Sequence, residues 1–186
     1  MSEINPNDTR SSHNVINVTV VIDTDLIISK FIGRNASQDQ KKPTQIGHEY
    51  SYMVATNKSV IKGSGTADLN IKANVGDVIR WTGVSESNNF DSSVLIYDLP
   101  KFGGTHVFTD AAFKMYTKKS MLPKPGSTGP FPVKFEEQSN WFIQADITKT
   151  GTEKYQVQFG VYYRPEGGEQ KLFGYFQWDP TITVSN

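Results

Sequence analysis

Apolar and polar residues alternate along several short segments of this chain, as they do in strands with one buried face. Residues 15–22 are instead apolar and β-branched on both faces, which indicates a central strand. Gly76-Asp77 predicts a turn, with residues 78–84 returning as the hairpin partner of the strand before it. That strand, residues 67–75, shows the clearest alternation, with Ala67, Leu69, Ile71, Ala73 and Val75 on one face and Asp68, Asn70, Lys72 and Asn74 on the other.

Similar patterns predict most of the remaining chain to be strand. In residues 171–178 either Phe176 and Trp178 face the core while Tyr175 and Gln177 point out, or the reverse. Many short strands joined by Gly/Pro turns predict an all-β fold: a single-domain antiparallel β-sandwich, jelly-roll-like or Greek-key-like, with one short helix and long loops. The further predicted strands are 50–56, 93–98, 141–148, 154–163, 171–178 and 181–184.

Four segments depart from the strand pattern. The apolar run 26–32 predicts a short helix that Asp23 or Thr24 caps and Gly33 ends. Residues 34–49 form a long polar loop. Residues 100–139 are rich in Pro and Gly near their end, which predicts a surface excursion outside the sheets, with a helical turn at 111–116. The polar residues 1–13 are expected to be a flexible N-terminal arm, and residues 14–186 to be the sandwich domain.

Charge and composition exclude several classes of function. The chain has nineteen Lys plus Arg and nineteen Asp plus Glu residues, so its formal net charge is zero. It lacks the positive charge typical of nucleic-acid-binding proteins, and no net charge repels copies of the chain from one another. The absence of cysteine excludes disulfides and thiolate chemistry. No basic start precedes an apolar run, and no run approaches the ~18 apolar residues of a membrane helix. We therefore expect a cytoplasmic protein with no signal peptide, no membrane insertion and no nucleic-acid partner.

Residues with catalytic chemistry are sparse. There is no Gly-x-Ser-x-Gly elbow and no phosphate-binding loop. The three histidines, His13, His48 and His106, lack the spacing of metal ligands. We expect no enzyme activity, no cofactor and no metal. Asp23 and Asp25 are weak candidates for a calcium site, although an Asp-x-Asp pair caps helices and turns as well.

The aromatic residues leave a binding function open. Jelly rolls often serve as lectins, and exposed aromatic rings suit the apolar faces of sugars, although most strand aromatics fill a core. The candidate ligand-binding residues are Asp23, Asp25, Tyr175, Trp178 and Asp179.

Three segments together resemble the AidA/PixA family of bacterial inclusion body proteins. They are the aromatic stretch 173–184, the segment 17–25 and the segment 63–77, and residues 52–56 also fit. The resemblance covers about residues 15–184. It implies a small non-enzymatic protein made in quantity by Gram-negative bacteria, often under quorum or stationary-phase control. Some members form cytoplasmic crystalline inclusions and others are linked to animal hosts.

Two functional hypotheses follow. The first is an inclusion body protein that self-associates, starting from a homodimer, and accumulates in the cytoplasm. The alternative is a carbohydrate-binding or host-interaction module with a glycan ligand. The PixA type is methionine-rich, whereas this chain has four Met, so a methionine-storage role is not expected.

Overall fold

The computed structural model describes residues 14–166 and 168–185, and its fold is mainly β, as the sequence predicts. Residues 1–13, predicted to be a flexible arm, lie outside the described residues.

The strands form three sheets. Sheet A contains β3 (Ser51–Val54), β1 (Val15–Ile22), β6 (Val78–Ser85), β10 (Val133–Asp146) and β9 (Ala112–Pro123) in that order. Sheet B contains β2 (Thr44–Gln45), β13 (Lys171–Trp178), β12 (Val157–Tyr163) and β7 (Ser92–Asp98). Sheet C contains β4 (Val60–Lys62), β5 (Leu69–Lys72), β14 (Thr181–Ser185), β11 (Gly151–Tyr155) and β8 (Lys101–Gly104).

The sheets are mixed, which corrects the prediction of a purely antiparallel sandwich. Strand β1 runs parallel to β6, β14 parallel to β5, and β13 parallel to β2, while the other pairs are antiparallel. Strand β1 lies between β3 and β6, so its prediction as a central strand is confirmed. Its parallel pairing brings residues more than 60 positions apart into register, as in the pair Val15 and Val78.

The three sheets share one core, and large aromatic side chains occupy its centre. Phe176 and Trp178 are fully buried, which decides between the two orientations left open for β13. The indole Nε1 of Trp178 donates to the carbonyl of Ala67 at 3.3 Å, so its polar atom is satisfied inside the core. Trp81, Tyr155 and Phe159 are also fully buried.

The predicted hairpin between residues 67–75 and 78–84 is wrong. The alternation is correct from Ala67 to Ala73, which bury their side chains as expected, but Val75 is exposed. Strand β5 pairs with β4 and β14, whereas β6 pairs with β1 and β10. The Asp77 carboxylate accepts from the backbone N–H groups of Asn74 and Asn14, both at 2.9 Å, and holds a turn that crosses between sheets. Alternation identifies the buried face of a strand but not its neighbour.

Helix α1 (Thr24–Phe31) is confirmed, with Asp23 as its N-cap. The Asp23 carboxylate accepts from Leu26 N–H at 2.8 Å, and Gly33 follows the helix at φ +71°. Two short 3-10 turns, η2 (His48–Tyr50) and η3 (Asn57–Ser59), flank β3. No helix in the described part of the chain is long and apolar enough to cross a membrane.

Removing the cap of α1 should lower stability modestly. We expect Asp23→Ala to reduce the free energy of unfolding by about 1 kcal/mol, because the Leu26 N–H loses its partner. Asp23→Asn, whose amide oxygen caps as well, should stay close to the wild type. Urea unfolding followed by circular dichroism measures both, and equal losses in the two variants would contradict the capping role.

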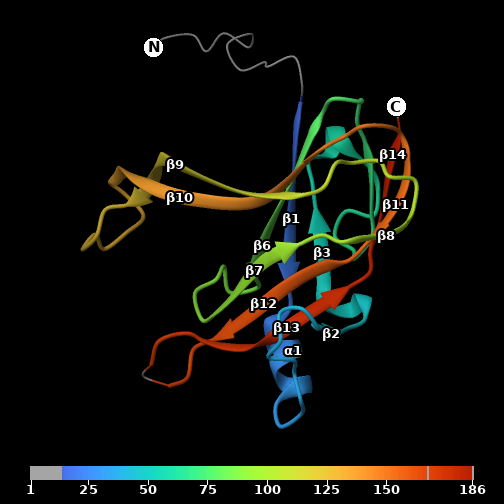
Figure 1. The fold of residues 1–186 in the computed structure, drawn as a ribbon. Coiled ribbons are helices and arrows are strands. Elements are labelled where there is room, and N and C mark those ends of the chain that lie inside the picture. Colours follow the sequence, from blue (N-terminus) through green and yellow to red (C-terminus); the bar gives the residue numbers. More distant parts are fainter. Residues whose placement is uncertain (1–13, 167, 186) are drawn as a thin grey trace, which may run out of the picture.

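The segment 100–139 is built differently from its prediction. The expected helical turn at 111–116 is wrong, because β9 begins at Ala112 and pairs with β10 continuously from Ala112–Gln144 to Pro123–Val133. Residues 124–132, which contain most of the Pro and Gly, connect the two strands, and residues 105–111 also lie outside the strands. Strands β9 and β10 and this connection form one long hairpin, called here the projecting hairpin, which extends away from the body (Figure 1).

Candidate functional site

The structure separates the residues proposed from the sequence as a ligand site. Asp23 and Asp25 lie at the start of α1, Tyr175 lies on sheet B, and Asp179 follows β13. Trp178 belongs to the core and presents no ring to solvent. Trp178 therefore cannot contribute a ring to a surface site with the other four residues.

The carboxylates near α1 are occupied by local structure. Thr24 N–H donates to Glu86 Oε2 at 2.7 Å, and Asp23 caps the helix. The Glu86 carboxylate raises the pKa of Asp25 above its ordinary value, with desolvation acting in the same direction. Among residues 14–166 and 168–185, no group of three or more His, Asp or Glu side chains is placed to hold a metal ion.

Asp179 takes part in a small polar cluster beside sheet C. His48 lies between two carboxylates, with Nδ1 at 3.3 Å from Asp68 Oδ2 and Nε2 at 3.8 Å from Asp179 Oδ1. Asp68 also accepts from Thr181 N–H at 2.8 Å, and Gln45 Nε2 donates to Asp179 at 3.0 Å. These contacts connect η2 to the junction between β13 and β14, so both aspartates have a structural role.

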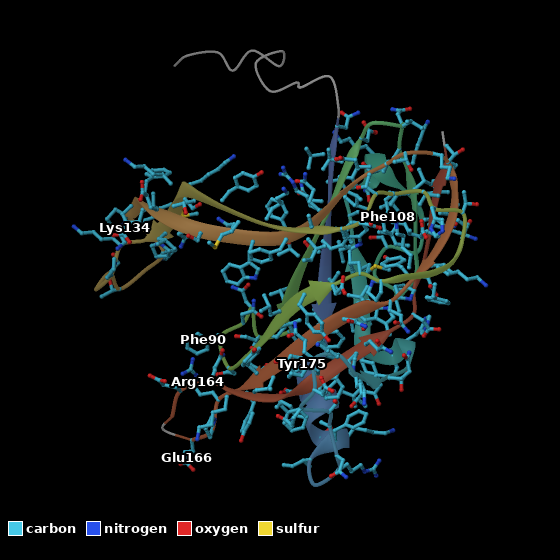
Figure 2. All side chains as sticks on the ribbon, viewed as in Figure 1. Phe90, Phe108, Lys134, Arg164, Glu166 and Tyr175 are labelled. Atoms are coloured by element: carbon cyan, nitrogen blue, oxygen red, sulfur yellow. The ribbon has the colours of Figure 1, made fainter. Side chains whose placement is uncertain are left out.

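Tyr175 belongs to a tyrosine cluster on the outer face of sheet B. Its ring meets that of Tyr97 edge-on, with centroids 5.7 Å apart. A Cβ atom on Gly160 would lie 3.3 Å from the ring of Tyr162 and 3.4 Å from that of Tyr175, so the glycine lets both rings lie over β12. The Tyr97 hydroxyl donates to the Gln40 carbonyl at 2.9 Å, which attaches the 34–49 segment to the sheet. Figure 2 shows Tyr175 over the strands of the body.

This cluster should make the protein sensitive to alkali. Burial raises the pKa of Tyr97 from 10.0 to about 12, and its neighbour Tyr175 adds to the shift. The native state therefore holds this proton more tightly than the unfolded chain. Its contribution to stability is complete below pH 10 and is lost as the pH rises through 12. We expect Tyr97→Phe to make the fall in unfolding free energy over this pH range less steep, measured by urea unfolding at a series of pH values. An unchanged slope would contradict this assignment.

Several exposed apolar side chains share one face of the projecting hairpin. Residues that pair across β9 and β10 share a face, and odd-numbered residues of both strands lie on the same one. This face, called here the apolar hairpin face, carries five large side chains that are 41–67% exposed: Phe113, Met115, Met121, Phe135 and Trp141. The opposite face carries Lys114, Tyr116, Lys118, Lys134 and Glu136 among others.

The apolar hairpin face is a continuation of the core face of sheet A. Ile143 on β10 pairs with Trp81 on β6, and both side chains are buried. Trp81 packs against Phe108 and Tyr155, with ring centroids 5.4 and 6.1 Å away. Trp141, the next residue of β10 on this face, is already 41% exposed. The core face therefore runs past the part of sheet A that the rest of the chain covers.

An exposed surface of this kind is unusual for a monomer. Soluble monomers rarely expose contiguous apolar patches larger than a few hundred Å², and larger ones mark interaction sites. A two-stranded hairpin without a covered face is also marginally stable in water. Lys134 lies near the outer end of the hairpin, well away from the body residue Phe108 (Figure 2). The hairpin is thus the best candidate for an interaction surface.

Comparison with known proteins agrees with this β-rich architecture. A crystal structure of an inclusion body protein from Burkholderia cenocepacia superimposes with a TM-score of 0.80, at 23% sequence identity, over 95% of this chain and 99% of that chain. A search of curated proteins gave no significant match. The family model described as PixA, inclusion body protein, matches residues 14–184. The match spans all three sheets and the projecting hairpin, and the chain therefore belongs to the PixA family of inclusion body proteins.

Proposed function

We propose that this protein is a non-enzymatic inclusion body protein that accumulates in the bacterial cytoplasm by self-association, and that the apolar hairpin face is its first contact. The observation that carries the proposal is the row of five exposed apolar side chains, which continues the core face of sheet A. Membership of the PixA family supports the inclusion body part of the proposal.

A second copy of the chain suits this face because the face is self-complementary. Lys119 and Glu137 are cross-strand partners on it, between the inner group around Trp141 and the outer pair Met121 and Phe135. If the twofold axis runs along the hairpin, β9 of one copy lies over β10 of the other, so that Lys119 lies over Glu137 and Met115 over Trp141. The contact then pairs its charges and buries the apolar groups together.

Contact through the faces fits the sequence better than contact through the strand edge. Strand β9 is the edge strand of sheet A, and an unpaired edge can add a strand from another molecule. If two copies of β9 paired side by side, the positive charges of Lys118 and Lys119 at its centre would repel those of the other copy. Pro123 at the end of β9 also lacks an N–H donor for such pairing. We therefore propose a homodimer in which the two hairpins pack face to face.

Growth from a dimer to an inclusion requires a second contact, since a twofold contact closes on itself. Phe90, between β6 and β7, and Phe131, in the hairpin connection, are 76% and 77% exposed and lie outside the apolar hairpin face. We propose these two side chains as contributors to the weaker contacts between dimers.

The proposal is tested by sedimentation velocity from micromolar to millimolar concentration, together with antibody labelling of thin sections of stationary-phase cells. We expect a dimer at low concentration, larger species at high concentration, and label confined to dense inclusions. A protein that remains monomeric at millimolar concentration, with diffuse label in cells, would refute it.

A further inference from the structure

An arginine lies at the base of the projecting hairpin, on the side opposite to the apolar hairpin face. Its orientation is fixed by neighbouring side chains, and it forms no ion pair with a described residue. Arg80 on β6 extends over the ring of Phe142, with its guanidinium carbon 4.5 Å from the ring centroid. Its Nε donates to Gln144 Oε1 at 2.9 Å. Stacking on one side and a hydrogen bond at Nε together fix the plane of the guanidinium group.

These contacts leave the terminal nitrogens of Arg80 available. Among the described residues, no carboxylate lies within ion-pair distance of Arg80, and neither terminal nitrogen donates to a protein atom. A guanidinium group whose orientation is fixed in this way matches the two oxygens of a carboxylate.

The surroundings of Arg80 form an open cavity rather than a flat surface. Its volume is about 390 Å³, and Arg80, Tyr116, Lys118, Asn140 and Phe142 line it. Ligand sites commonly have volumes of about 300–1,000 Å³, with apolar walls and a few convergent polar groups. The ring of Tyr116 stacks on that of Phe142 with centroids 5.7 Å apart, so the wall of the cavity is aromatic.

The local charge favours an anion. Lys118 adds a second cation to the cavity wall, and Lys114 lies on the same face of the hairpin. Among the described residues, none that lines the cavity is acidic, and Glu136, further out on the same face of the hairpin, forms an ion pair with Lys134. A cavity lined by one sign of charge raises the local concentration of the opposite ion.

From this arrangement we propose that the cavity at the base of the projecting hairpin binds a small organic carboxylate with a planar, apolar ring. The carboxylate accepts from the terminal nitrogens of Arg80, Lys118 supplies a second positive charge, and the ring lies against Tyr116. This site is on the face opposite to the apolar hairpin face, so the proposal does not depend on self-association.

Benzoate is the probe that tests the site, with acetate and benzyl alcohol as partial probes. In calorimetric titrations of the full chain, we expect benzoate to bind at least tenfold more tightly than acetate, and benzyl alcohol to give no measurable binding. In NMR spectra, benzoate should shift the Arg80 Nε–Hε signal and the Tyr116 ring signals. Benzoate affinity no better than that of acetate, or signals that change with protein concentration and not with benzoate, would overturn the proposal.

Benzoate affinities of variants distinguish specific binding at this site from general electrostatic attraction. We expect Arg80→Gln to weaken benzoate binding at least tenfold, and Arg80→Lys to weaken it as well, because lysine lacks the planar pair of donors. Lys118→Gln changes an exposed side chain, and it should weaken binding in a folded protein even if Arg80→Gln fails to fold. The control is Lys62→Gln, which removes the same charge from an exposed lysine of β4, outside both the cavity and the apolar hairpin face. A loss of affinity in Lys62→Gln equal to that in Lys118→Gln would overturn the proposal.

Discussion

Met115→Glu is expected to convert the protein into a monomer. Met115 is 60% exposed and lies beside Trp141 on the apolar hairpin face. Leaving an unpaired charge in a buried contact costs about 3–5 kcal/mol, and a twofold contact contains the substitution twice. Since 1.4 kcal/mol corresponds to a tenfold change, the dissociation constant should rise about 100-fold or more. Sedimentation velocity over a dilution series measures this change.

The matched control adds the same charge to the other face of the hairpin. Gln138→Glu changes a neutral side chain of β10 that pairs with Lys118 and points away from Met115. It should leave the dissociation constant close to that of the wild type. Equal weakening in both variants would indicate a general charge effect, and no weakening in Met115→Glu would place the contact elsewhere on the molecule.

Phe176→Ala should produce a large loss of stability. The Phe176 ring is fully buried, and its neighbours come from three elements. Phe31 of α1 lies 5.3 Å away, Phe159 of β12 6.0 Å and Phe173 of β13 6.2 Å, measured between ring centroids. Truncation of a buried phenylalanine to alanine costs about 3–5 kcal/mol, through lost transfer free energy and the remaining cavity. Urea unfolding monitored by tryptophan fluorescence is the measurement.

Phe90→Ala provides the comparison, because the same chemical change is made at a side chain that is 76% exposed. At dilute concentration its unfolding free energy should stay within about 0.5 kcal/mol of the wild type. Similar losses in the two variants would show that the ring cluster around Phe176 does not anchor α1 to sheet B.

The sequence predicted the buried faces of the central strands but not their neighbours. The alternation of Leu69 and Ile71 correctly placed both side chains in the core, because burial of one face leaves a period of two in the sequence. That period carries no record of which strand lies alongside. The turn at Asp77 was therefore predicted to close a hairpin, whereas it connects β5 of sheet C to β6 of sheet A.

The projecting hairpin was missed because its strands lack a buried face along most of their length. Lys118-Lys119 interrupts the apolar alternation of β9, and the Pro/Gly-rich connection suggested a surface loop. A usable signal was nevertheless present. Phe113, Met115 and Met121 precede the connection at positions of one parity, and Phe135 and Trp141 follow it at positions of the same parity. Two such series around a Pro/Gly turn are typical of a hairpin with one apolar face.

The candidate ligand residues show the limit of reasoning from residue type. Asp23 was assigned either to a cap or to calcium, and its hydrogen bond to Leu26 N–H shows the cap. Aromatic character alone could not distinguish Trp178 in the core from Tyr175 on the surface. The sequence does not identify Arg80 as a binding residue, because Phe142 and Gln144, which fix its guanidinium group, are more than 60 positions away.

The position of β14 in sheet C has a consequence for biosynthesis. Strand β14 lies between β5 and β11, and it brings Ile182 beside Leu69 and Glu153. While a ribosome is still adding residues 181–185, β5 and β11 have no strand between them, and one edge of each remains unpaired. Sheet C can therefore close only after this segment has left the exit tunnel. Nascent chains on neighbouring ribosomes of one message would then expose unpaired strands close together, where association between copies can begin before folding is complete.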